Sequence, residues 1–318
     1  MKEGLFIIAR GIGQVMFQNN ALSGLLMLAG IACNSWILAL LALAGNIVST
    51  LTACLCKYSR EDIRNGLYGF NGTLVGIAIG VFMEINISSM FLLLFGSALS
   101  TWISRLFNRQ KTIPGFTAPF IITVWILLLG NLYLFPTLLL PAIPHVSEAV
   151  AHLPKACCLN IGQVMFQGGN ILAGLLFLIG ILVNSRIQAI YTVWGAFLPL
   201  LVVLPLTTDF SAFNAGLLGY NGVLCSIALG NRTFKSIAWA TLAILLSTGI
   251  QITGMYAGIT TLTAQQARSM RHVWRWKSSE VRHILIHLHI QNRISRKSCV
   301  AVAILLLILW HSSNVSIR

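Results

Sequence analysis

Apolar segments separated by short polar connections run through most of the chain. In the first half they cover residues 12–31, 36–55, 67–82, 90–107 and 117–140. In the second half they cover residues 161–183, 188–206, 215–230 and 236–256. A helix that crosses a bilayer needs about 17–25 mostly apolar residues, and most of these segments have that length. The pattern predicts an all-α polytopic membrane protein.

The second half of the chain repeats the first. Residues 13–18, Gly-Gln-Val-Met-Phe-Gln, return unchanged as residues 162–167, and the Leu-Tyr-Gly-Phe-Asn-Gly of residues 67–72 returns as the Leu-Leu-Gly-Tyr-Asn-Gly of residues 217–222. Because a complete half, like the first, has five elements, an odd number, two such halves of one inserted chain would face opposite ways across the membrane. In such inverted repeats the site commonly forms between the halves, near the middle of the membrane.

The most polar connection lies between the two copies, where three prolines accompany histidine, glutamate and lysine. We therefore expect a first membrane repeat over residues 1–141 and a connector over residues 142–159. An incomplete second repeat would cover residues 160–264, and a basic tail residues 265–318.

The repeat stops matching after Ala264. The Thr-Ala-Pro-Phe that opens the last segment of the first half should recur there, but Gln265-Gln266 follows instead. Residues 265–297 contain eight Lys or Arg and four His, a composition that cannot cross hydrocarbon. Residues 299–310 are apolar but too short to span. We expect the tail to be foreign to this fold, the product of a frameshift or an unrelated terminus.

Composition narrows the class of protein. The chain is 57% hydrophobic and 9% charged, whereas soluble domains carry about 25% charged residues. The net charge of +14 does not indicate nucleic-acid binding, because more than half of the excess lies in the last 54 residues. The rest fits a Lys/Arg bias in loops on the cytoplasmic side.

The apolar segments offer little for catalysis. Residues 12–31, 67–82, 161–183 and 215–230 lack Asp, Glu, His, Lys and Arg, so they hold neither a base nor a usual proton or ion site. We expect no enzyme activity, no cofactor and no metal. Each half does offer Gln, Phe, an aromatic-Asn-Gly stretch and Thr. These residues suit either hydrogen-bonded packing between helices or a path for a small, neutral, planar solute.

Three motifs resemble the urea transporter family in its bacterial form. They are the Gln-Val-Met-Phe-Gln-Asn-Asn of residues 14–20, the Leu-Tyr-Gly-Phe-Asn-Gly-Thr-Leu of residues 67–74 and the Thr-Ala-Pro-Phe of residues 117–120. The likeness covers about residues 5–264. It implies two inverted five-helix repeats, each with a re-entrant half-helix, around a central pore. It also implies a homotrimer in the bacterial inner membrane, with one pore in each subunit.

The resemblance assigns roles to six residues near the centre of the path. Gln14 and Gln163 would lie at the ends of the two half-helices, facing the pore, and Val15 and Val164 would flank the filter. The narrow midpoint would be lined by the matching pair Thr117 and Thr263.

The resemblance also implies two flat apolar slots. Phe17, Phe70 and Leu74 would form one slot. The other slot would consist of the matching residues Phe166, Tyr220 and Leu224, in which Tyr220 departs from the family's Phe. Aromatic walls would orient the plane of urea, and backbone carbonyls would accept its N–H groups without a charged site.

The implied function is passive, selective transport of urea across a lipid bilayer. One alternative is a channel for another small neutral solute, such as ammonia, water or a short amide. Another is a non-transporting remnant that has lost its last pore helix after Ala264.

Overall fold

The computed structural model describes residues 2–110, 115–141 and 146–256, and within these ranges the regular secondary structure is helical. The first half contains α1 (Lys2–Gln14), α2 (Ala21–Asn34), α3 (Trp36–Leu55), α4 (Arg60–Arg64), α5 (Gly69–Phe82), α6 (Ile87–Gln110), α7 (Ala118–Leu134) and η1 (Pro136–Leu138). The second half contains α8 (Leu153–Gly162), η2 (Gln163–Met165), α9 (Ile171–Asn184), α10 (Arg186–Val203), α11 (Ser211–Asn214), α12 (Tyr220–Leu229) and α13 (Phe234–Tyr256).

Four of the described helices are long and apolar enough to cross a membrane, and they lie within α3, α6, α10 and α13. The remaining described apolar helices are shorter. The helical structure and the four long apolar helices confirm the all-α polytopic membrane class predicted from the sequence. The expected tail, residues 265–318, lies outside the described residues.

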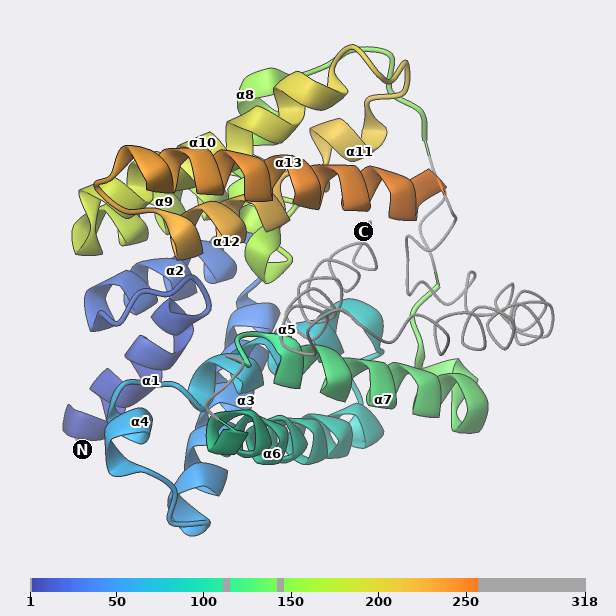
Figure 1. Ribbon diagram of the computed structural model, residues 1–318. Coiled ribbons are helices and arrows are strands. Elements are labelled where there is room, and N and C mark those ends of the chain that lie inside the picture. Colours follow the sequence, from blue (N-terminus) through green and yellow to red (C-terminus); the bar gives the residue numbers. More distant parts are fainter. Residues whose placement is uncertain (1, 111–114, 142–145, 257–318) are drawn as a thin grey trace, which may run out of the picture.

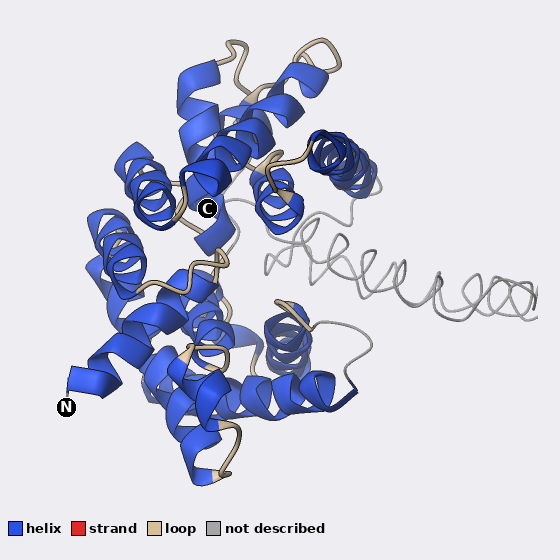
Figure 2. Ribbon diagram, turned by 60° about the vertical axis from the view of Figure 1, so that its left-hand side comes forward, coloured by secondary structure: helices blue, strands red, loops and turns tan. Residues whose placement is uncertain are grey.

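The two halves form separate helical layers that meet through α2 and α9 (Figure 1). The turned view shows the same two groups of helices, one above the other (Figure 2). Met27 and Ile31 of α2 and Phe177 and Ile181 of α9 are fully buried in one apolar cluster. Gly30 allows this approach, because a Cβ there would lie 2.8 Å from the Phe177 ring.

The apolar segments at residues 12–31 and 161–183 are each interrupted, in agreement with the half-helices that the family resemblance implies. The chain leaves the helix after Gln14 and after Met165, and it restarts with α2 and α9. Asn20 caps α2 by accepting from the Leu22 N–H at 2.8 Å, and Asn170 caps α9 in the same way. The polar residues between the helices therefore act as a stop and a new start.

The last apolar run of the first half, residues 117–140, is shorter as a helix than expected. Helix α7 ends at Leu134, just before Pro136, which cannot continue the hydrogen-bond ladder. The chain then pairs with the end of α5, where the Leu140 N–H donates to the Phe82 carbonyl at 3.0 Å.

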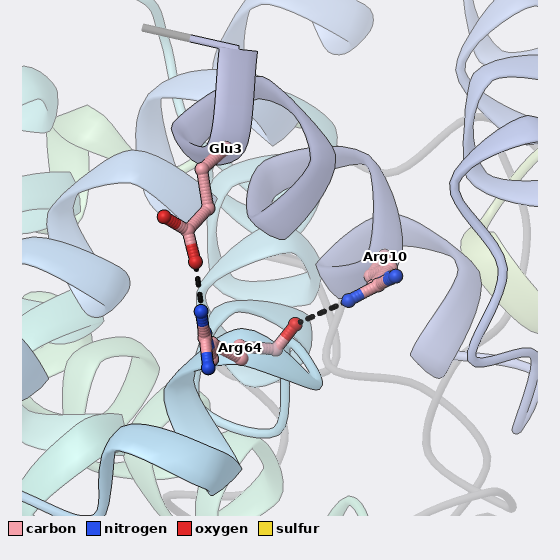
Figure 3. Close-up of polar contacts among 3 residues, drawn as sticks. All are labelled: Glu3, Arg10 and Arg64. Carbon is pink, nitrogen blue, oxygen red and sulfur yellow. Dashed lines mark hydrogen bonds and ion pairs between the residues drawn. The ribbon is translucent and has the colours of Figure 1, made fainter.

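Successive crossings place the connections alternately at two faces. One face, towards the left of Figure 1, holds α4, the α9–α10 junction and the start of α13, and the end of α6 belongs to it. Helix α1 begins there too, because Glu3 forms a 2.8 Å ion pair with Arg64 and Arg10 donates to the Arg64 carbonyl at 3.2 Å (Figure 3). The end of α7, the start of α8 and the end of α10 lie at the opposite face.

Charges are divided unevenly between these two faces. The first, which we call the cationic face, carries Arg10, Lys57, Arg60, Arg64, Arg105, Arg109, Arg186, Arg232 and Lys235 against Glu3, Glu61 and Asp62. The opposite face carries Lys155 against Glu84, Glu148 and Asp209. Among the described residues, nearly all of the basic side chains therefore lie at one of the two faces.

Small residues bring α3 and α5 into close contact. A Cβ added at Gly72 would lie 2.2 Å from the Gly45 carbonyl oxygen and 2.2 Å from the Ser49 hydroxyl. A Cβ at Gly76 would lie 2.0 Å from the Leu41 carbonyl oxygen. Small-residue contacts of this kind drive helix association in membranes, where apolar burial itself contributes little.

An asparagine has changed helices between the two repeats. In the first repeat Asn46 of α3 fills the space left by Gly11 of α1, and its amide donates to the Ile8 carbonyl at 3.1 Å. In the second repeat the matching positions hold Ala196 and Asn160, and the Asn160 amide donates to the Ala196 carbonyl at 2.7 Å. The repeats thus keep one buried amide at this contact but supply it from opposite helices.

The α3–α5 contact predicts a specific effect of one methyl group. Gly72→Ala should lower the free energy of unfolding by about 1–3 kcal/mol, because the helices must separate to admit the Cβ. The matched control is Gly130→Ala in α7, where nothing lies within 4 Å of the added Cβ. Thermal unfolding in detergent would measure both, and equal effects of the two substitutions would contradict the close-packing account.

Candidate functional site

Helix α1 ends with an aromatic residue in a conformation that usually requires glycine. Phe17 has φ 60°, in the left-handed region. Its N–H donates to the Gln14 carbonyl at 3.0 Å, and the Gln18 N–H donates to the Gly13 carbonyl at 3.0 Å. This pair of bonds is the Schellman motif, which closes a helix by satisfying its last carbonyls.

The second repeat ends its half-length helix in the same way. Phe166 has φ 62° and its N–H donates to the Gln163 carbonyl at 3.0 Å. The Gln167 N–H donates to the Gly162 carbonyl, again at 3.0 Å. The identical six residues therefore build two identical helix ends, related by the internal repeat.

A non-glycine residue held in this region costs about 1–3 kcal/mol, and such residues gather at functional sites. A glycine would make the same turn without that cost. Both repeats nevertheless have Phe at this position. Both rings are half-buried and pack against the central apolar cluster.

The two glutamines expected at the half-helix ends occupy equivalent environments. Gln14 is the last residue of α1, and its amide donates to the Asn65 carbonyl at 2.9 Å. Gln163 follows the end of α8, and its amide donates to the Ala215 carbonyl at 3.0 Å. Each amide thus fixes the half-helix end to the connection before a short apolar helix of its own repeat, α5 in the first and α12 in the second.

Sequence reasoning missed a second pair of glutamines, Gln18 and Gln167, which bind across the repeats. Both are fully buried. Gln18 accepts a hydrogen bond from the Asn184 amide at 2.8 Å, and Gln167 accepts one from the Asn34 amide at 2.8 Å. Their presence in the repeated hexapeptide was a signal, and so was the repeat of the Asn-Ser pair at the ends of α2 and α9.

The amide nitrogens of these two glutamines hold the turns themselves. Gln18 Nε2 donates to the Met16 carbonyl at 2.6 Å, and Gln167 Nε2 donates to the Met165 carbonyl at 2.6 Å. Gln18 makes one further bond, to the side-chain oxygen of Gln188 at 2.9 Å. Each turn is therefore tied both to itself and to the opposite repeat.

The remaining described site candidates gather in one place. Val15, Leu74, Val164 and Tyr220 are buried, and Phe17, Phe70, Phe166 and Leu224 pack against the same apolar cluster. The ring of Phe166 lies between two aromatics of the first repeat, 6.0 Å from Phe82 and 6.1 Å from Phe120, both edge to face. The second helix end thus reaches into the first repeat.

The asparagine of the aromatic-Asn-Gly stretch positions the start of α7. Asn71 accepts a hydrogen bond from the Phe120 N–H at 3.1 Å and donates to the Ser104 hydroxyl at 3.2 Å. Thr117 stands at the N-cap of this helix and is half-buried. The matching residue Thr263 lies outside the described residues.

The eleven described site candidates are uncharged, so the site has no group to neutralise an ion. It can offer carbonyl and amide groups as hydrogen-bond partners, together with the faces and edges of aromatic rings. One further polar group is the Tyr220 hydroxyl, which is buried and forms no hydrogen bond of complete geometry with the described residues. These groups can hydrogen-bond a small neutral solute and stack against it.

The fold is an all-α polytopic membrane fold of two related helical halves, in which the half-length helices end on an uncharged aromatic cluster. Residues 5–266 match the family described as urea transporter, and the chain belongs to that family.

Two curated relatives are mammalian proteins named urea transporter 1. The rat protein is 34% identical over 254 residues, which cover 74% of this chain and 64% of the rat protein. The sheep protein is 31% identical over 286 residues, which cover 84% of this chain and 70% of the sheep protein. The chain thus spans slightly less than two thirds of the rat protein.

The bonds between the repeats should be measurable as a coupling. Gln18→Ala and Asn184→Ala should each destabilise the protein, and the double variant should lose less than their sum. Double-mutant cycles for hydrogen bonds between membrane helices average about 0.6 kcal/mol, with a maximum near 1.7 kcal/mol.

The internal repeat supplies the matched test, because Gln167 and Asn34 should show a coupling of similar size. Thermal unfolding of the purified protein is the measurement. Additive losses in both cycles would show that these bonds do not hold the repeats together.

Proposed function

We propose that this protein is a passive urea channel whose path runs between the two half-helix ends. The observation that carries the proposal is the paired left-handed phenylalanines, Phe17 and Phe166, at the ends of α1 and α8. At both positions a strained backbone conformation places an aromatic ring at the helix end. Such rings would suit a path that must orient a flat molecule. Family membership and the names of the mammalian relatives support urea as that molecule.

The chemistry of urea fits the groups at this site. Urea is neutral and planar, with four N–H donors and one carbonyl acceptor. Aromatic walls from Phe70 and Tyr220, at matching positions of the two repeats, would confine its plane beside Phe17 and Phe166. The carbonyls at each helix end would accept its N–H groups, so it could shed water without meeting a counter-charge.

The path proposed from the resemblance keeps two slots, with Phe17, Phe70 and Leu74 in one slot. Phe166, Tyr220 and Leu224 would form the other slot. Gln14 and Gln163 would face the pore beside Val15 and Val164, and the threonine pair Thr117 and Thr263 would line its midpoint.

Assembly and location follow from the same family. We infer a homotrimer, with one path in each subunit, in the inner membrane of a bacterium. The cationic face would be cytoplasmic, because loops rich in Lys and Arg stay on that side during insertion. The chain would then comprise a first repeat over residues 1–141, a connector over residues 142–159, a second repeat over residues 160–264 and a tail over residues 265–318.

Flux measured in proteoliposomes tests the function directly. Stopped-flow light scattering should show urea uptake that is faster than that of acetamide or glycerol and saturates at high urea. Imposed proton or sodium gradients should leave the rate unchanged, because the described segments around the path hold no ionisable residue at the depth where coupled transporters use one. A rate that follows either gradient would contradict a passive pore, and equal rates for all solutes would favour a general channel.

The same assay tests the role of the tail. A version whose residues 265–318 are replaced by Pro-Phe and a copy of residues 121–140 should conduct faster than the unmodified chain, since the copy supplies the last helix that the second repeat is expected to lack. Equal rates would show that the tail is functional. A repaired protein that is folded and trimeric but passes no urea would favour a non-transporting role.

The aromatic walls give a residue-level prediction. Phe70→Ala and Tyr220→Ala should each reduce urea flux by about tenfold or more, which corresponds to about 1.4 kcal/mol in the barrier. Selectivity over acetamide should fall as well, because the solute gains room to tumble. Phe91→Ala, at an α6 position that is 67% exposed, is the matched control and should leave both unchanged. Unchanged flux in folded Phe70 and Tyr220 variants would assign these rings to packing alone.

A further inference from the structure

A long apolar groove lies on the outside of the second repeat. It has a volume of about 850 Å³ and is formed between α9, α10 and α13. Its walls are the aliphatic and aromatic side chains Leu178, Leu182, Ile190, Val193, Trp194, Phe197 and Ile237. Several of these are widely exposed, with Ile190 at 69%. An apolar trough of this kind, open towards the membrane, suits a hydrocarbon chain.

Two arginines line one end of the groove. Arg186 is the first residue of α10, and Arg232 lies just before α13. Both are exposed, and neither has a carboxylate within ion-pair distance among the described residues. The neighbouring polar groups are neutral, since Asn231 lines the same end and the Tyr191 hydroxyl donates to the Asn231 carbonyl at 2.9 Å. Two guanidinium groups above an apolar trough favour an amphiphile with an anionic head.

The first repeat provides an internal comparison. The position that matches Arg186 holds Trp36, and the connection before α6, the counterpart of α13, contains Glu84 and no Arg or Lys. The repeat symmetry therefore does not require the two arginines. They lie on the cationic face, where basic residues would attract the anionic lipids of a cytoplasmic leaflet.

We propose that this groove binds an anionic phospholipid, with its phosphate between Arg186 and Arg232 and one acyl chain along α10. The guanidinium groups would bind the phosphate oxygens, and Ile190 and Trp194 would contact the chain. The site is separate from the proposed solute path, because its lining residues come from the outer surfaces of α9, α10 and α13. It is therefore independent of which solute the protein conducts.

Lipid binding by the purified full chain tests the proposal. Native mass spectrometry would compare retention of phosphatidylglycerol with that of phosphatidylcholine, and inorganic phosphate alone would serve as a third probe. We expect preferential retention of phosphatidylglycerol, at least tenfold reduced by the double substitution Arg186→Gln and Arg232→Gln. Lys235→Gln removes a charge from the same face but outside the groove, so it should retain the lipid. Equal losses for all of these variants would show a general surface charge effect and overturn the site.

A second variant separates the groove from its arginines. Ile190→Trp would fill the trough and leave both guanidinium groups in place, so lipid retention should fall while the protein stays folded. Unchanged retention would overturn the acyl-chain placement. If Ile190→Trp instead dissociates an oligomer in lipid-free detergent and leaves phosphatidylglycerol retention intact, the groove is a subunit interface. Binding of inorganic phosphate as strong as that of the lipid would make the site an anion site only.

Discussion

Two half-length helices end inside the apolar part of this protein, and each must satisfy its last carbonyl groups where water cannot do so. The chain meets this constraint with a Schellman turn whose left-handed residue is Phe and not Gly. The turn is then held from the side by a buried glutamine, Gln18 in one repeat and Gln167 in the other. The aromatic cluster and the proposed path depend on these two closures, because they set where Phe17 and Phe166 point.

The same glutamines also join the halves. Their side-chain oxygens accept hydrogen bonds from asparagines at the ends of α2 and α9. In each glutamine the amide nitrogen therefore closes the turn, and the amide oxygen binds the opposite repeat. Hydrogen bonds and small-residue packing have to hold this interface, because an apolar side chain is as favourably placed against lipid as against another helix. At the same interface the first repeat contributes two aromatic neighbours to Phe166 of the second.

Away from this centre the repeats have diverged. The buried amide beside α1 and α8 is supplied by Asn46 in one repeat and by Asn160 in the other. The basic residues gather on one face of the molecule, whichever repeat they belong to. Orientation in the membrane and contact with lipids depend on surface residues and not on the residues around the proposed path. The surfaces of the two repeats can therefore differ while the two helix ends stay alike.

The sequence alone determined the membrane class, the internal duplication, the family and the uncharged character of the site, because these depend on composition, spacing and identity along the chain. The breaks within residues 12–31 and 161–183 were implied by the family resemblance, but the apolar pattern alone does not show them, because it carries no information on a turn stabilised by distant amides. Nor did the sequence predict the partners of the two glutamines: Gln14 bonds within its own repeat, whereas Gln18 bonds across to Asn184. Only the tertiary structure decided that difference, because it depends on which helix lies beside each turn, and residues about 170 positions apart meet there.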